Sequence, residues 1–173
     1  NVGTEMGIAR IWKVFIFHVL VDQYGDTPYF GAGKGFLDGN VRPAYDDDQV
    51  IYMDMLKELE EGLAQIGAAS TLGGADLVFN GDTAKWKKFG NSLMLRLAMR
   101  IKNVDASGSN TWAQKAINGG TMASNDDTAF MIHTDGPADL NRNSWGVYQP
   151  RYAQARIGAT LYDWLANNGD PRL

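Results

Sequence analysis

The stretch DTAKWKKFGNSLMLRLAMRI, residues 82–101, decides the fold of this chain. Apolar residues recur along it at helical spacing, namely Trp86, Phe89, Leu93, Leu97 and Ile101. This period places them on one face of an α-helix, while the charged residues lie elsewhere on its surface. Asp82 or Thr83 is a favourable N-cap because its side-chain oxygen accepts a free backbone N–H. We therefore predict a helix over about residues 83–103.

Two more long helices are expected before this one. The first covers residues 3–23 and is apolar almost all round, so we expect it to be buried on several sides. The second covers about 47–66, and the acidic run 46–48 at its start favours capping of the helix by a carboxylate. Calcium binding is the alternative, but this run lacks the alternating ligands of an EF-hand loop. The helices at 47–66 and 83–103 are candidates for an antiparallel hairpin.

The remaining segments are shorter and richer in loops. A short helix is predicted at about 111–118, and a last helix at about 155–168 is closed by Gly169. Only residues 128–132 are typical of a strand. The spacing of Trp86, Phe89, Gly90 and Leu93 also matches the opening of a tetratricopeptide repeat. The predicted fold class is mostly α, with tetratricopeptide-like helical pairs and long irregular loops.

The composition is that of a folded protein with no preference for nucleic acid. Of 173 residues, 45% are hydrophobic, and the net charge is −4. Binding to phosphate backbones needs a cationic surface, so nucleic acid is not an expected partner. The chain has no cysteine, which excludes disulfides and thiolate chemistry. Its most apolar run, residues 14–21, is shorter than the roughly 20 residues that a membrane helix needs.

The sequence offers little support for catalysis or for metal binding. His18 lies inside the apolar run and is expected to be a buried, hydrogen-bonded core residue, and the other histidine, His133, is not placed beside it. The glycine-rich residues 31–35 lack the Lys-Ser/Thr ending and the preceding strand of a phosphate-binding loop. We therefore predict no catalytic residue, no metal site and no cofactor.

The turn sequence DQYGDTPY, residues 22–29, keeps one alternative open. Asp22 and Asp26 could act as the carboxylate pair of a glycosidase, which must lie about 5–10 Å apart. However, Asp22 ends a helix and Asp26 sits in a Gly-Pro turn, where aspartate commonly bonds to nearby backbone. We favour a helix stop followed by a turn, and a hydrolase remains the alternative.

Sugar binding has milder requirements, because an aromatic ring and a few fixed polar groups suffice. Trp145 and Tyr148 lie in a polar loop, residues 141–150, where helical burial does not explain them. Arg142 and Asn143 precede them and can bind hydroxyl groups. Tyr29, with its neighbour Phe30, is a second candidate. In contrast, Trp12, Trp86 and Trp164 lie within predicted helices and are expected in the core.

Four motifs in order resemble the SusD/RagB family of nutrient-binding outer-membrane lipoproteins from Bacteroidetes. They are the Asp-x-Tyr-Gly-Asp-x-Pro-Tyr turn, Pro43-Ala44-Tyr45-Asp46, the Gly81-Asp82…Asn91-Ser92-Leu93…Arg96-Leu97-Ala98-Met99-Arg100 stretch, and Asn168-Gly169-Asp170-Pro171-Arg172-Leu173. These motifs cover nearly the whole chain. One departure is Gly90, where the family more often has alanine.

The resemblance implies a tetratricopeptide-like scaffold that packs against a SusC-type TonB-dependent transporter. Residues 1–173 would be a single partial domain, the N-terminal helical part of a longer SusD-like protein. The implied function is non-catalytic glycan binding at the cell surface and delivery of oligosaccharide to that transporter. Localisation at the outer membrane would depend on a lipid anchor outside this chain. The alternative within the same complex is a helical scaffold or a peptide-capture subunit.

Overall fold

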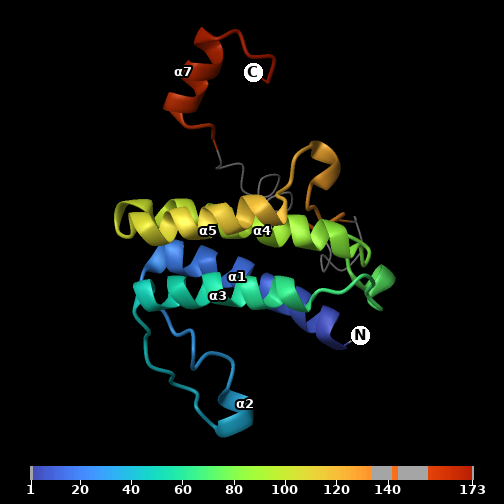
Figure 1. Cartoon of the computed structure of the whole chain (residues 1–173). Coiled ribbons are helices and arrows are strands. Elements are labelled where there is room, and N and C mark those ends of the chain that lie inside the picture. Colours follow the sequence, from blue (N-terminus) through green and yellow to red (C-terminus); the bar gives the residue numbers. More distant parts are fainter. Residues whose placement is uncertain (1, 134–141, 144–155, 173) are drawn as a thin grey trace. The chain divides into compact units, whose positions relative to one another are not determined.

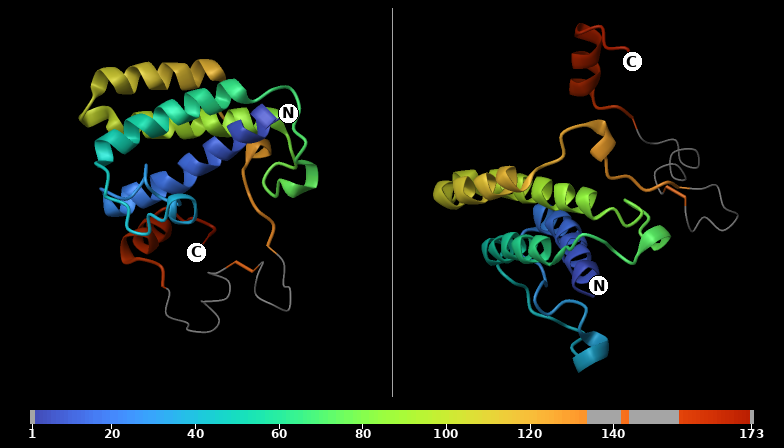
Figure 2. Two further views of the ribbon diagram at one scale, coloured as in Figure 1. Left: turned by 90° about the horizontal axis from the view of Figure 1, so that it is seen from below. Right: turned by 45° about the vertical axis from the view of Figure 1, so that its right-hand side comes forward.

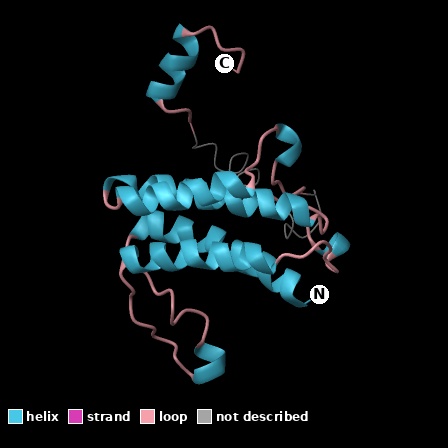
Figure 3. Ribbon diagram, in the orientation of Figure 1, coloured by secondary structure: helices cyan, strands magenta, loops and turns pink. Residues whose placement is uncertain are grey.

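The computed structural model describes residues 2–133, 142–143 and 156–172. The helices are α1 (Val2–Tyr24), α2 (Gly35–Asp38), α3 (Asp48–Gln65), α4 (Thr83–Arg100), α5 (Ala106–Gly119) and α7 (Ala159–Asn167). Three 3-10 turns accompany them: η1 (Gly73–Ala75), η2 (Ile101–Asn103) and η3 (Asn125–Asp127). The mostly helical fold class is confirmed (Figure 3), since the described residues contain no strand. The strand predicted at 128–132 is wrong, because the described segments offer it no strand partner.

The boundaries of the three long helices agree with the sequence to within about three residues. Asp47 caps α3, since its side chain accepts the N–H groups of Gln49 and Val50, and Asp82 caps α4 in the same way. Helix α5 begins earlier than predicted because Asp105 caps it through the N–H of Gly108. Helix α7 begins later than predicted, at Ala159, and Gly169 closes it with a positive φ of 58°.

The chain divides into two compact units, Asn1–Met131 and Ile132–Leu173. Within the first unit, α1 packs mainly on α3 and α4 packs mainly on α5, while α3 and α4 join the two pairs. Figures 1 and 2 show these pairs as two layers, which is the tetratricopeptide-like arrangement predicted from the sequence. That residues 1–173 form a single partial domain stays a prediction.

Two glycines let the backbones of α1 and α3 touch. A Cβ atom on Gly7 would lie 2.5 Å from the carbonyl oxygen of Gly62, and one on Gly62 would lie 3.1 Å from that of Gly7. Gly90 on α4 faces the same region, since a Cβ there would lie 2.8 Å from Ile11 and 2.9 Å from Leu63. Glycine at position 90, where the family that the sequence resembles more often has alanine, therefore makes room for two apolar side chains of the core.

The motif on α4 also ties the chain together through polar side chains. Asn91 is buried and donates to the carbonyl oxygen of Gly119 at 2.9 Å, which satisfies the end of α5. Ser92 accepts the N–H of Met122 at 2.8 Å, and this bond holds the chain as it leaves α5. The Asn-Ser pair of the motif thus has a structural role.

In the second unit, Leu165 of α7 is buried but Trp164 is 55% exposed. The prediction that Trp164 belongs to the core is wrong, because consecutive helical residues point about 100° apart and Leu165 takes the inward direction. Trp86 is buried and Trp12 packs against the core, as expected. His18 is also buried, as predicted, with Nδ1 2.6 Å from the carbonyl oxygen of Phe15.

Candidate functional site

The predicted sugar-binding residues fall in different parts of the chain. Trp145 and Tyr148 lie outside the described residues, so their proposed stacking role stays a prediction. Arg142 and Asn143 are described and exposed. Tyr29 belongs to the first unit, where it is part of the helical scaffold.

Tyr29 is only 3% exposed and packs between several side chains. Phe17 and Phe30 meet its ring edge-on at 4.8 and 4.9 Å between ring centroids, and the ammonium of Lys13 lies 4.6 Å from the ring centroid. Burial, with the nearby Asp54 carboxylate adding to it, raises the pKa of the Tyr29 hydroxyl. In this conformation most of its ring is covered, so a ligand role for Tyr29 rests on the sequence alone.

The loop after Tyr29 instead exposes other aromatic residues. Phe36 is 99% exposed, and Tyr45 and Phe30 are also exposed. This loop starts at the ends of α1 and α3, and with α2 it lies on the side of α3 away from α4 and α5 in Figure 1. Phe36 and Tyr45 were not among the predicted ligand residues, although aromatic residues in a glycine-rich loop were the available signal.

The turn at residues 22–29 joins the ends of three helices. The carboxylate of Asp22 accepts the hydroxyl of Tyr52 from α3 and lies 2.8 Å from the guanidinium of Arg100, the last residue of α4. Asp26 accepts the N–H of Asp48 at 3.0 Å, at the start of α3. The expected bonding of these aspartates to nearby backbone is wrong, because their partners lie on α3 and at the end of α4.

Asp46 completes this junction from the other side of the loop. Thr27 and Asp46 form an isolated antiparallel bridge, and the Asp46 carboxylate accepts the N–H groups of Tyr29 and Phe30 at 2.8 and 2.9 Å. The acidic run therefore caps a helix and fixes a loop, as predicted in preference to calcium ligation. Among the residues that the structure describes, no three His, Cys, Asp or Glu side chains are grouped to hold a metal ion.

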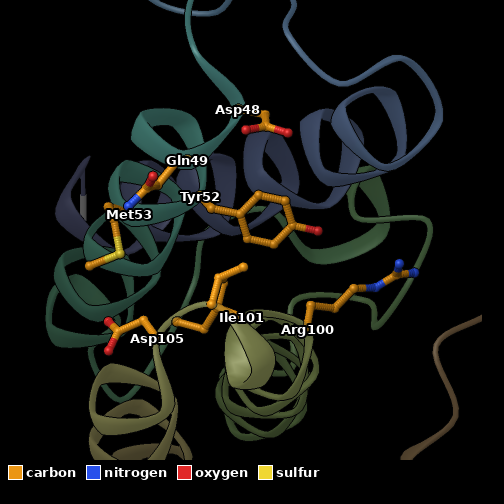
Figure 4. Close-up of a pocket in the computed structure, with 8 residues that line it drawn as sticks. Asp48, Gln49, Tyr52, Met53, Arg100, Ile101 and Asp105 are labelled. Carbon is orange, nitrogen blue, oxygen red and sulfur yellow. The ribbon is translucent and has the colours of Figure 1, made fainter.

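A pocket of about 300 Å³ lies beside this junction, between the start of α3 and the end of α4. Helix α3 contributes Asp48, Gln49, Tyr52 and Met53. The end of α4 and the turn that follows contribute Arg100, Ile101, Val104 and Asp105. Figure 4 shows the Tyr52 ring reaching across from α3, with its hydroxyl on the side of Arg100. The lining is mostly apolar, with polar groups at its rim.

Tyr52 is held in place by its partners. Burial, and next the Asp22 carboxylate that its hydroxyl binds, raise the pKa of Tyr52. The hydroxyl is protonated at neutral pH, as in any tyrosine, and donates to Asp22. An aromatic ring fixed in this way, next to an apolar floor and a few polar groups, is the arrangement that binds a small, mostly flat ligand.

The contact between these pocket residues was not predicted from the sequence. Tyr52 was assigned to the apolar seam of its helix, and Arg100 to a charged surface. Tyr52 lies 30 residues after Asp22, and Arg100 lies 48 residues after Tyr52. No local spacing in the sequence therefore indicates their contact. The one signal was a carboxylate at the end of a buried helix.

Comparison with known proteins identifies the chain's relatives. A family model for SusD-like proteins, described as "Starch-binding associating with outer membrane", matches residues 1–173. A solved chitin-binding protein shares 36% identity over 96% of this chain, with a TM-score of 0.82. A SusD homologue from Bacteroides uniformis shares 33% identity over 86% of it, with a TM-score of 0.74. A search of curated proteins found no match.

A third solved relative is a chitin-binding SusD homologue from Flavobacterium johnsoniae, 28% identical over 96% of this chain, with a TM-score of 0.82. The chain covers 35%, 30% and 34% of these three structures, so it spans about a third of their length. Within the part of the chain described here, none of the helices is both long and apolar enough to cross a bilayer.

Proposed function

Because the chain belongs to the SusD-like family, we propose that it binds glycans at the cell surface and delivers oligosaccharide to a SusC-type TonB-dependent transporter. Its attachment to the outer membrane would be through a lipid anchor outside these 173 residues. The observation that carries this proposal is the match of the family over residues 1–173, in a family described as starch-binding.

The first glycan to test is chitin, the polymer of N-acetylglucosamine. Two of the solved relatives are described as chitin-binding, and one of them is 36% identical to this chain. The exposed aromatic side chains of the first unit, Phe36 and Tyr45, offer apolar faces on which sugar rings can stack. In the second unit, Trp145 and Tyr148 stay candidates for stacking and Arg142 and Asn143 for binding hydroxyl groups, and Tyr29 stays a candidate on the basis of the sequence alone.

Binding without turnover is the second part of the proposal. The two carboxylates that could serve a glycosidase, Asp22 and Asp26, hold the ends of other helices. A carboxylate bound to Arg100 and Tyr52 is not poised to donate a proton to a glycosidic oxygen. The bound oligosaccharide should therefore remain intact.

Pull-down of the purified protein on insoluble chitin, with affinity electrophoresis against soluble polysaccharides and titration with peptides, tests the proposal. We expect binding to one glycan, no shortening of the glycan, and an affinity about tenfold weaker in Trp145→Ala. Trp164→Ala is the matched control, because Trp164 is an exposed tryptophan elsewhere in the chain. Binding of peptides without any glycan would favour the peptide-capture subunit, and release of shortened sugars would favour a hydrolase.

A further inference from the structure

We propose that the pocket between α3 and α4 is a subsite for one sugar ring, with Tyr52 as its stacking platform. This inference rests on the proposed function, because it assigns a place on the scaffold to part of a bound glycan. The pocket volume of about 300 Å³ is at the lower end of the range for ligand sites, so it has room for one sugar ring.

The platform is fixed before any ligand arrives. The Tyr52 hydroxyl binds Asp22, and Asp22 in turn binds Arg100 at 2.8 Å, so three helices hold one ring. A sugar that stacks on Tyr52 would not have to order this side chain, which lowers the entropic cost of binding. Ile101 and Met53 line the pocket beside the ring and extend its apolar surface (Figure 4).

Polar groups at the rim suit hydroxyl groups, which both donate and accept hydrogen bonds. The Gln49 amide can do both, and the Asp48 carboxylate accepts. Neither side chain is engaged by another of the described residues. One oxygen of Asp105 accepts the N–H of Gly108 at 2.8 Å, and its other oxygen is the remaining acceptor of this rim.

A basic side chain from a polypeptide is the rival ligand, because Asp48 and Asp105 would attract it. Arg100 lies on the same wall and repels a second cation, although Asp22 offsets part of its charge. An apolar lining with an aromatic face favours a ring with apolar C–H groups over a lysine or arginine. The sugar is therefore the ligand that fits both the lining and the rim.

The test is a pair of substitutions in the purified protein, titrated with the N-acetylglucosamine hexamer by calorimetry. Val104 is 82% exposed and lines the pocket, so Val104→Arg obstructs it without disturbing the core. Val50 is 53% exposed on the same unit and does not line the pocket, so Val50→Arg is the matched control. We expect Kd to rise about tenfold in Val104→Arg and to stay unchanged in Val50→Arg.

Amide NMR shifts during the same titration show which residues respond. Shifts at 48–53 and 100–105 are expected with the hexamer. If the hexamer binds but both arginine variants keep the affinity of the unmodified protein, the pocket inference is overturned while the proposed function stands. If no glycan binds, the proposed function fails together with the inference. Shifts at these residues with a lysine-rich peptide and none with sugar would assign the pocket to a polypeptide and overturn the inference.

Discussion

Two aspartates in this unit each bind an aromatic side chain, Asp76 with Trp86 and Asp22 with Tyr52. Asp76 is a buried residue, and its carboxylate accepts the Trp86 indole N–H at 2.6 Å. It also accepts the backbone N–H groups of Val78, Phe79 and Gly81, at 3.0, 3.2 and 2.9 Å. Asp76 thus closes the corner between η1 and α4 completely.

The environment of Asp22 differs from that of Asp76. Its side chain is 17% exposed, its partners are the side chains of Tyr52 and Arg100, and an open pocket lies beside them. The role of each carboxylate therefore depends on which groups donate hydrogen bonds to it. Backbone donors from its own turn make Asp76 part of the fold, whereas side-chain donors from other helices make Asp22 the support of a surface.

The largest effect is expected for Asp76→Ala. The substitution leaves the buried Trp86 indole N–H and three backbone N–H groups without their acceptor. We expect the free energy of unfolding to fall by about 3 kcal/mol in urea titrations. Asp82→Ala is the control, since loss of that helix cap should cost about 1 kcal/mol. An equal fall in the free energy of unfolding in both variants would mean that Asp76 contributes no more to stability than an ordinary helix cap.

A smaller loss of stability is expected for Asp22→Ala, together with a loss of affinity. Tyr52 and Arg100 are both partly exposed and can turn to water, so the free energy of unfolding should fall by about 1 kcal/mol. The Kd for the hexamer should rise about tenfold, because the Tyr52 ring is no longer held. Asp26→Ala, in the same turn, should keep its affinity. A fall of about 3 kcal/mol in the free energy of unfolding without a change in Kd would mean that Asp22, like Asp76, serves only the stability of the fold.

The substitution Tyr52→Phe tests the bond between Tyr52 and Asp22 by itself. It keeps the ring and removes only the hydroxyl that binds Asp22. We expect a change of about 0.5 kcal/mol in the free energy of unfolding and a Kd about threefold higher, measured by the same two methods. An unchanged Kd would mean that the hydroxyl does not position the ring.

A smaller effect is expected from acid, which weakens the hydrogen bonds of Asp76. Burial alone would raise the pKa of Asp76, but the hydrogen bonds from Trp86 and the backbone outweigh it and lower that pKa. Because the pKa is lower in the folded state, this stabilisation is complete above the unfolded pKa of about 3.9 and is lost as the pH falls through the folded value. Urea titrations from pH 7 to 3 should show that loss in the unmodified protein. An unchanged acid response in Asp76→Asn would contradict this.

The helices could be predicted where the deciding information is local. The start of α4 follows from Asp82 and an apolar period, and both lie within one stretch of sequence. The first turns of α5 were missed because residues 107–110, SGSN, are weak helix formers, and the cap at Asp105 overrides that preference.

The pocket could not be predicted in the same way. It depends on where the ends of α1, α3 and α4 meet, and that position is set by close packing such as the contact between Gly7 and Gly62. Tyr52 has the spacing of a core residue, and only the position of Asp22 in space turns its hydroxyl toward Arg100. For Trp145 and Tyr148, the sequence remains the sole basis for a role.

Retention of the purified protein on insoluble chitin, with release by the soluble N-acetylglucosamine hexamer, is the decisive measurement for glycan binding. We expect retention, release by the hexamer, and a hexamer recovered at its original length. A protein that passes through chitin and through every other polysaccharide of the panel would contradict glycan binding by this chain.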